Sequence, residues 1–385
     1  MITQTLAIFA DAYRELNAKK LFWIVLIISA FAMLAFAGFK ADSQALYYFG
    51  FKFPEWGIPP KTMYKTIFTG FVIGLWLTWA ATIIALMSTA SIFPDLISGG
   101  SIDLFLSKPI SRVRLFFTKY FSGLMFVILQ VAVVCTMGYF ALGIRAGTWN
   151  AKIFWGIPIV VCFFSYLFSI CVLLGVMTRS AFAALPLTIL FWMLCWGVST
   201  TELVFLQFKT DSQLDLNRLR LQIDTYDKRI AMMQPKPTTQ PATTQPTTTQ
   251  PAEPRLLTDF KETRARLFDK LPETESTVAR WKNWHQLIYS IKTFLPKTSE
   301  TIALLERHLV SREETAAMAS ADEGRRNKRK SASSDEEIDV PKERTDLAVN
   351  NELRDRSVGW IVGTSLLFEA VVLSLAAWIF NRRDF

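Results

Sequence analysis

Side chains suited to chemistry are scarce in the apolar part of this sequence. Glu369 is the only acidic or basic residue within a predicted membrane span. His285 and His308 lie in a polar insert outside any H-E-x-x-H pattern, and no G-x-x-x-x-G-K-[ST] P-loop is present. We therefore expect no catalytic residue, metal or cofactor in this chain. We expect the cysteines to pack as small apolar residues: Cys135, Cys162, Cys171 and Cys195.

Glu369 is the one site residue that the predicted spans contain. An ionisable group at mid-span is costly and usually faces a cavity or a partner. It could line a translocation path or hold a dimer seam by hydrogen bonding. It could equally be protonated and satisfied by Ser365 or Thr364, one turn away.

A second candidate site is the loop over residues 89–119, between the second and third predicted spans. Pro94 is expected to end the second span, and Gly99-Gly100 to break the chain. A short amphipathic element follows, and such an element outside the bilayer favours a groove on another protein. The alternative is an interfacial turn on lipid, with Lys108, Arg112 and Arg114 at anionic headgroups. The apolar side chains are Ile102, Leu104, Phe105 and Leu106, flanked by Asp95, Asp103 and Lys108.

The order of residues in this loop resembles the membrane subunits of ABC-2 type ABC transporters. The match covers Gly100-Ser101-Ile102-Asp103-Leu104-Phe105-Leu106 and Ser107-Lys108-Pro109-Ile110-Ser111-Arg112. Lys119-Tyr120 and the terminal Asn381-Arg382-Arg383-Asp384-Phe385 also fit. Within that family, the chain is most similar to the multi-copper enzyme maturation type of permease.

The resemblance implies that this loop is a coupling helix seated in a cleft of a cytoplasmic ATPase. That separate subunit would bind ATP and Mg, and a second permease subunit would complete a homo- or heterodimer. ATP-driven closure would then tilt the second and third spans. The implied coupling residues are Asp95, Gly99, Gly100, Asp103, Leu104, Leu106, Lys108, Pro109 and Arg112.

The composition divides the chain into two parts. Of all residues, 51% are hydrophobic and only 19% are charged, which is too apolar for an ordinary soluble domain. The segment from Glu202 to Arg356 holds 26 of the 42 Lys and Arg and 25 of the 33 Asp and Glu. The basic excess therefore belongs to the apolar remainder, as in cytoplasmic loops of membrane proteins, and no nucleic-acid partner is expected.

We expect an all-α membrane protein with six transmembrane helices, because six stretches are long enough to cross a bilayer. A domain of transmembrane helices 1–5 would cover residues 21–201, and helix 6 with a cytoplasmic tail residues 357–385. Residues 1–20 are predicted to form a cytoplasmic amphipathic helix at the interface. The spans are 21–39, 66–94, 120–144, 153–178, 180–201 and 357–381.

The positive-inside rule orients these spans. With both termini in the cytoplasm, the short inner segments carry ten Lys and Arg and the short outer loops carry six. We therefore expect a multi-pass protein of the cytoplasmic (inner) membrane, with both termini in the cytoplasm and residues 202–356 on the extracytoplasmic side.

The insert over residues 202–356 shows helical periodicity on both sides of a Pro/Thr/Gln tract. Apolar residues that recur three and four positions apart predict two helices with coiled-coil seams, which would pair as an antiparallel hairpin. Disordered linkers are expected over 234–254 and 319–346, and a further helix over 299–317. An aromatic stripe at Trp281 and Trp284 would lie either at the headgroup level or in the core of the insert. The seam residues are Leu216, Leu219, Ile223, Tyr226, Ile230 and Met233, then Leu257, Phe260, Leu267 and Leu271.

Two functions fit these features. The first is a permease subunit that moves a substrate across the membrane, with ATP hydrolysed by a separate subunit; its charge-poor spans favour a lipid-like or amphiphilic cargo. The second is a non-transporting scaffold that anchors a coiled-coil interaction domain, with an extracytoplasmic protein as its partner.

Overall fold

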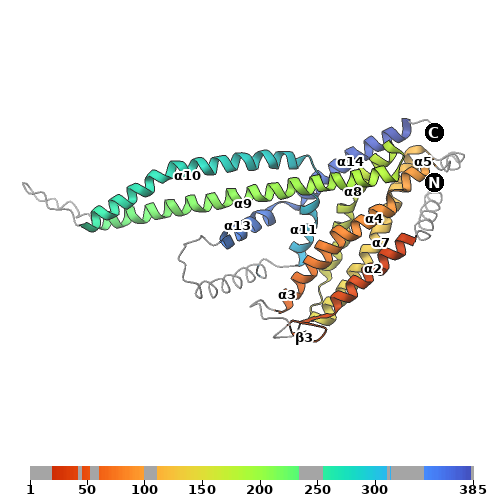
Figure 1. Ribbon diagram of the computed structural model, residues 1–385, viewed down its shortest axis with the longest axis horizontal. Coiled ribbons are helices and arrows are strands. Elements are labelled where there is room, and N and C mark those ends of the chain that lie inside the picture. The colour runs from red at the N-terminus through yellow and green to blue at the C-terminus, as the bar shows by residue number, and fades with distance from the viewer. Residues whose placement is uncertain are drawn as a thin grey trace, which may run out of the picture. The chain divides into compact units, whose positions relative to one another are not determined.

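The computed structural model describes residues 20–41, 46–52, 60–98, 111–233, 255–309, 313 and 342–382. Helices dominate these residues (Figure 1). In chain order the elements are α2 (Lys20–Ala37), β1 (Phe39–Ala41), β2 (Leu46–Tyr48), β3 (Phe51–Lys52), α3 (Pro60–Ile67), η1 (Phe68–Ala81), α4 (Thr82–Thr89), α5 (Ile92–Ser98), α7 (Arg112–Ala146), η2 (Ala151–Trp155), α8 (Gly156–Thr178), α9 (Ala181–Met233), α10 (Arg255–Thr293), α11 (Thr298–Leu309), α13 (Lys342–Asp355) and α14 (Val358–Arg382).

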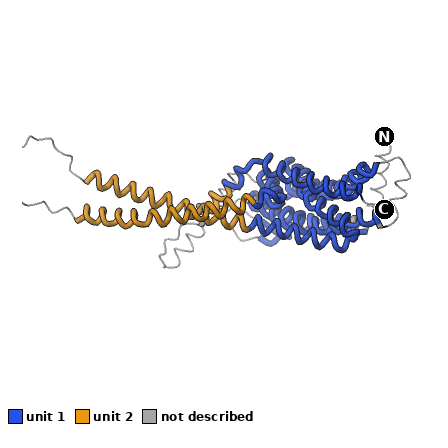
Figure 2. Tube along the Cα trace, turned by 90° about the horizontal axis from the view of Figure 1, so that it is seen from above, with its two compact units in different colours: residues 1–200, 291–339, 351–385 blue, residues 201–290, 340–350 orange. Residues whose placement is uncertain are grey.

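The chain divides into two compact units, coloured separately in Figure 2. The transmembrane unit comprises residues 1–200, 291–339 and 351–385. The hairpin unit comprises residues 201–290 and 340–350. The division after Thr200 agrees with the start predicted for the insert at residue 202. The insert is not one unit, however, because residues 291–309 and 351–356 group with the transmembrane helices.

Among the described residues, five helices are long and apolar enough to cross a membrane. They begin at Thr62, Arg112, Ala151, Ala181 and Val358, close to the predicted spans two to six. The protein is therefore an all-α, multi-pass type of membrane protein. The apolar part of α2, Trp23–Ala37, is shorter than these five. The first predicted span, over residues 21–39, therefore stays a prediction, and so does the total of six. The interfacial helix over residues 1–20 lies almost wholly outside the described residues.

The helix α8 is the centre of the transmembrane unit. Of its apolar stretch 78% is buried, against 28% for α14 and 22% for α9. It packs against α14, α7, α11 and α5. Phe163, Phe164 and Phe168 are fully buried along it. An all-round apolar helix is expected at such a central position, whereas one-sided burial leaves the outer helices to face lipid.

The second predicted span continues past its expected end at Pro94, since the apolar helical stretch runs from Thr62 to Ile97 with a short turn at residues 90–91. Regular helix stops at Thr89, and α5 restarts at Ile92 with Pro94 in its first turn. Pro94 therefore does not end the span as predicted. In the first turn of a helix the backbone amides have no acceptor within the helix, so the missing amide proton of a proline costs no hydrogen bond there. Upstream, η1 is a π-helix, in which the Thr78 hydroxyl donates to the Ile73 carbonyl five residues back.

A small antiparallel sheet follows α2 and was not predicted. Strand β2 pairs with β1 (Phe39 opposite Tyr48) and with β3 (Tyr48 opposite Phe51). The turn between β2 and β3 consists of Phe49 and Gly50, both with positive φ. Such a two-residue turn matches the twist of a hairpin, and it escaped prediction because Phe49 is an unusual residue for that conformation.

The hairpin unit confirms the predicted antiparallel pairing. Later residues of α9 contact earlier residues of α10, as in an antiparallel pair. Arg220 forms an ion pair with Glu275 at 2.7 Å, and Asp227 forms one with Arg264 at 2.9 Å. The ring of Tyr226 lies 5.8 Å from that of Phe260. Leu216, Ile223 and Leu257 of the predicted seams are buried, and Met233 is exposed. Whether the two helices supercoil stays a prediction.

The other features predicted for the insert fall partly outside the described residues. The linker predicted over 234–254 lies outside them. Helix α13 begins at Lys342, so the linker predicted up to residue 346 gives way to helix earlier. Helix α11 begins at Thr298, one residue before the predicted start at 299.

Candidate functional site

The predicted coupling loop is described at its two ends. Gly99, Gly100, Asp103, Leu104, Leu106, Lys108 and Pro109 lie outside the described residues. Asp95 is exposed in the first turn of α5, where a carboxylate suits the helix dipole. Arg112 is the first residue of α7, after the N-cap residue Ser111, whose hydroxyl accepts a hydrogen bond from the Arg114 amide.

Three phenylalanine rings join the helices that flank this loop. Phe93 of α5 has its ring centroid 5.0 Å from that of Phe116 on α7. Both contact Phe380 of α14, at 6.5 and 5.7 Å. All three side chains are fully or almost fully buried. Such close-packed aromatic contacts couple the positions of α5, α7 and the C-terminal part of α14.

Glu369 is buried and hydrogen-bonded within the chain. The Tyr120 hydroxyl of α7 donates to Oε1 at 2.7 Å, and the Ser165 hydroxyl of α8 donates to Oε2 at 2.7 Å. Tyr120 also stacks on Phe168, with centroids 5.2 Å apart. The carboxyl group therefore joins three helices by neutral donors, one at each oxygen.

These contacts differ from the local partners considered for Glu369. The Ser365 hydroxyl donates to Ile361 O and accepts from the Lys297 amide. Thr364 accepts from Lys297 Nζ. The sequence could not show this, because Tyr120 and Ser165 lie far from Glu369 along the chain. The roles in a translocation path or a dimer seam stay predictions.

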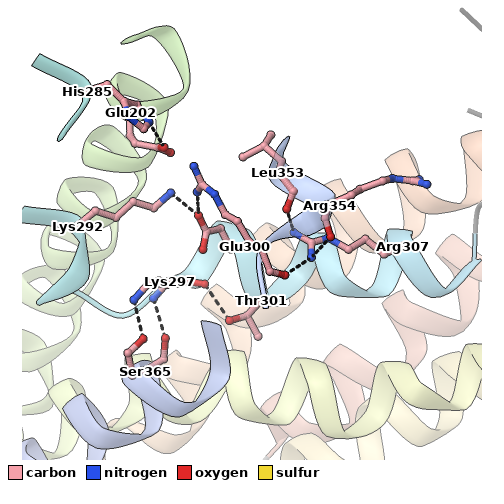
Figure 3. Close-up of polar contacts among 12 residues, drawn as sticks. Glu202, His285, Lys292, Lys297, Glu300, Thr301, Arg307, Leu353, Arg354 and Ser365 are labelled. Atoms are coloured by element: carbon pink, nitrogen blue, oxygen red, sulfur yellow. Dashed lines mark hydrogen bonds and ion pairs between the residues drawn. The ribbon is translucent and has the colours of Figure 1, made fainter. Parts of the chain in front are cut away.

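A second buried carboxylate, Glu300 of α11, was not singled out from the sequence. Its Oε1 atom contacts Lys292 Nζ at 2.7 Å and also binds Arg356 Nη1 (Figure 3). All three side chains are at most 10% exposed. A buried ion pair is stable only when its charges stay matched, so this cluster pins α11 to the residues before α14.

Arg307 and Lys297 extend this cluster (Figure 3). Arg307 donates to the carbonyl oxygens of Leu353, Arg354 and Arg356, at the C-terminal end of α13. Lys297 is 1% exposed; its Nζ donates to Thr364 at 2.6 Å and lies 5.3 Å from the centre of the Trp360 ring. Burial lowers the pKa of Lys297 from its ordinary value, and the nearby Glu300 carboxylate partly opposes this.

This cluster left one signal in the sequence. The stretch Lys292 to Arg307 brings Lys297 and Glu300 next to apolar residues at helical spacing, such as Leu304 and Leu305. Both leucines are buried, and α11 packs against α8, η1 and η2. The amphipathic pattern therefore predicts a helix with one buried face. Because α11 lies within a polar insert, the sequence did not indicate that this face packs on the apolar helices.

In the hairpin unit, the aromatic stripe packs onto α9. The Trp281 ring lies 4.8 Å from Phe208, and the Trp284 ring lies 6.2 Å from Phe205. Next to them, His285 Nε2 is 3.0 Å from the buried Glu202 carboxylate. The stripe therefore packs on α9 but is not buried, since Trp284, Ile291 and Phe208 are about half exposed. Whether it lies in the core of the insert or at the headgroup level stays a prediction.

The described residues contain no group of three or more His, Cys, Asp or Glu side chains that could hold a metal ion. The four cysteines are free thiols within the transmembrane unit. No protein-family model, curated protein or solved structure matches the chain. Its function is therefore inferred from the residues and their contacts.

Proposed function

We propose that this chain is the membrane-spanning permease subunit of an ABC-2 type transporter. It would move a substrate across the cytoplasmic membrane, with ATP hydrolysed by a separate ATPase subunit and a second permease subunit beside it. The observation that carries the proposal is the Phe93–Phe116–Phe380 contact, which joins the two ends of the loop that resembles a coupling helix.

This contact gives the loop a mechanical role. A force applied between Ser98 and Ser111 acts on α5 and α7 together, because Phe93 and Phe116 are packed on each other. Tyr120 lies one turn beyond Phe116 and hydrogen-bonds Glu369 of α14. A rigid displacement of the loop would thus reach three helices of the bundle, since packed interfaces shift as units.

The orientation follows from the same loop. A coupling element must face the compartment that holds ATP, so α5 and the C-terminal end of α14, which meet at Phe93 and Phe380, would lie at the cytoplasmic face. The hairpin unit would then be extracytoplasmic. A reporter enzyme fused near Gln245 should be active only outside, and activity inside would overturn this orientation.

Association with an ATPase is the direct test. The full-length protein, extracted gently from its own membrane, should co-purify with a nucleotide hydrolase. The double change Leu104→Asp and Leu106→Asp should abolish this, because a charge cannot enter an apolar cleft without loss of affinity. Leu221→Asp is the matched control, since Leu221 is 66% exposed on the hairpin. Retention of the ATPase by the double variant would contradict the proposal.

The scaffold hypothesis is the second candidate, favoured by the antiparallel hairpin. Its exposed charged faces, with the Arg220–Glu275 and Arg264–Asp227 pairs, resemble a surface for protein contacts. Crosslinking from the hairpin that captures one protein partner, in preparations that never contain a nucleotide hydrolase, would favour the scaffold over the permease.

A further inference from the structure

Two adjoining hollows of the transmembrane unit share the side chain of Arg145. The first is a groove of about 350 Å³ between α2 and α7, lined mainly by Met33, Leu34, Met137, Phe140 and Ile144 and ending at Arg145. The second is a pocket of about 530 Å³ beside the small sheet, lined by Arg145 with Lys40, Tyr47 and Phe49. Both volumes are within the usual range of ligand sites.

The two hollows differ in chemistry. The groove exposes almost only carbon, and it lies between α7, which is long and apolar enough to cross a membrane, and the shorter apolar helix α2. The pocket carries the cations of Lys40 and Arg145, and its described lining contains no carboxylate. Among the described residues, no acidic side chain forms an ion pair with either cation.

The change from apolar to basic lies at the level expected for the membrane surface. Arg145 is in the last turn of α7, which ends at Ala146 before Gly147, a residue with φ of 64°. Trp149 follows, exposed, with its ring 5.2 Å from that of Tyr139. Tryptophan and tyrosine gather where a span leaves the hydrocarbon, so in a bilayer Arg145 and Lys40 would lie near the headgroup layer.

We infer that this groove and pocket bind one anionic phospholipid. An acyl chain would lie in the groove between α2 and α7, and the phosphate would contact Arg145 and Lys40. A molecule with an apolar tail and an anionic head matches both hollows at once, whereas an uncharged lipid matches only the groove. The inference does not rest on the proposed transport function, because the site would exist on a permease or a scaffold.

Native mass spectrometry of the full-length protein in detergent tests this site. Phosphatidylglycerol should bind more tightly than phosphatidylcholine with the same acyl chains. Arg145→Gln and Lys40→Gln should each weaken phosphatidylglycerol about fivefold, since each cation contributes at that scale near a membrane surface, and should leave phosphatidylcholine unchanged. Equal binding of the two lipids by the unmodified protein would overturn the inference.

A matched variant distinguishes binding at this site from a general attraction of the anionic lipid to any lysine or arginine near it. Lys152 is exposed in the short helix η2, which follows α7, but lines neither hollow. Lys152→Gln should therefore retain the affinity, and a loss as large as that of Arg145→Gln would contradict a defined site. Circular dichroism and size-exclusion chromatography would show that each variant keeps its fold.

The acyl chain has its own test. Ala30 lines the groove, and Ala30→Phe should weaken phosphatidylglycerol by filling it. Ala32→Phe, on the same helix but outside the lining, should not. Glycerol 3-phosphate at millimolar concentration should fail to displace the lipid, because it lacks the tail. Displacement by glycerol 3-phosphate would overturn the lipid assignment in favour of a site for free phosphate groups. Equal effects of the two phenylalanines would contradict an acyl chain in this groove.

Discussion

Glu369 and Glu300 are both buried carboxylates of the transmembrane unit, but Glu369 receives hydrogen bonds from two hydroxyls whereas Glu300 contacts two cations. The hydroxyls have other acceptors nearby: Tyr120 also reaches the Ser165 carbonyl at 3.2 Å, and Ser165 the Cys162 carbonyl at 2.8 Å. Lys292 and Arg356 would instead lose the buried negative charge that both of them contact. Loss of the negative group should thus be far costlier at Glu300.

The largest effect is expected from Glu300→Gln. It would remove the buried carboxylate that Lys292 and Arg356 both contact, and the removal of one partner from a buried ion pair costs about 3–5 kcal/mol. The free energy of unfolding, measured in detergent, should fall by this amount. Glu306→Gln, at an exposed position of the same helix, is the control. If Glu300→Gln lowers the free energy of unfolding no more than Glu369→Gln does, the proposed difference between the two carboxyl groups is contradicted.

A smaller effect is expected at Glu369. Glu369→Gln keeps one carbonyl oxygen as an acceptor, and Tyr120→Phe removes one neutral hydroxyl that is shared between Glu369 and the Ser165 carbonyl, so each should cost about 1 kcal/mol. Tyr139→Phe is the control, because Tyr139 makes ring contacts with Trp149 and Phe154. The double variant of Tyr120 and Glu369 should cost less than the two single losses combined, since they share one bond. Full additivity would refute the shared bond.

The alkaline range tests the charge of Lys297. Because burial lowers the pKa of Lys297 in the folded state, the unfolded chain binds more protons, and stability rises with pH. The rise should occur between the lowered pKa and the ordinary value of 10.5, and should be complete above both. Thermal melts at several pH values should show it in the unmodified protein and not in Lys297→Met. If the melting temperatures of the unmodified protein and of Lys297→Met change with pH in parallel, the lowered pKa of Lys297 is contradicted.

The smallest effect is expected at the exposed pair of the hairpin. Arg264 and Asp227 are 39% and 48% exposed, so their charges are well solvated and screened by salt. Arg264→Met should change the free energy of unfolding by less than about 1 kcal/mol. A loss comparable to that of Glu300→Gln would show that exposure does not set the cost of an unpaired charge in this protein.

Features with a repeating pattern were predictable from the sequence. Within the described part of the chain, long apolar runs marked the five helices that could cross a membrane, since backbone groups in lipid must bond within their own helix. Steps of three and four placed Leu216, Ile223 and Leu257 on the buried face of the hairpin. The start of α14 at Val358 also fell within one residue of the prediction. These features depend on residues close together in the chain.

Features made by distant residues were not predictable. Glu369 was identified from its position in an apolar run, but its contacts with Tyr120 and Ser165 were not. The prediction for Pro94 was wrong because the same residue fits a first helical turn as readily as a helix end.

The sequence by itself determined where this protein has apolar helices, where it has a charged insert, and which loop resembles a coupling helix. Local periodicity and hydrophobicity suffice for these. Only the tertiary structure decided that α11, from within the polar insert, packs on the transmembrane helices, and that Lys292 and Arg356 share Glu300. It also brought Lys40 and Arg145 to one pocket. Side chains far apart in the chain meet only through packing, which no local pattern encodes.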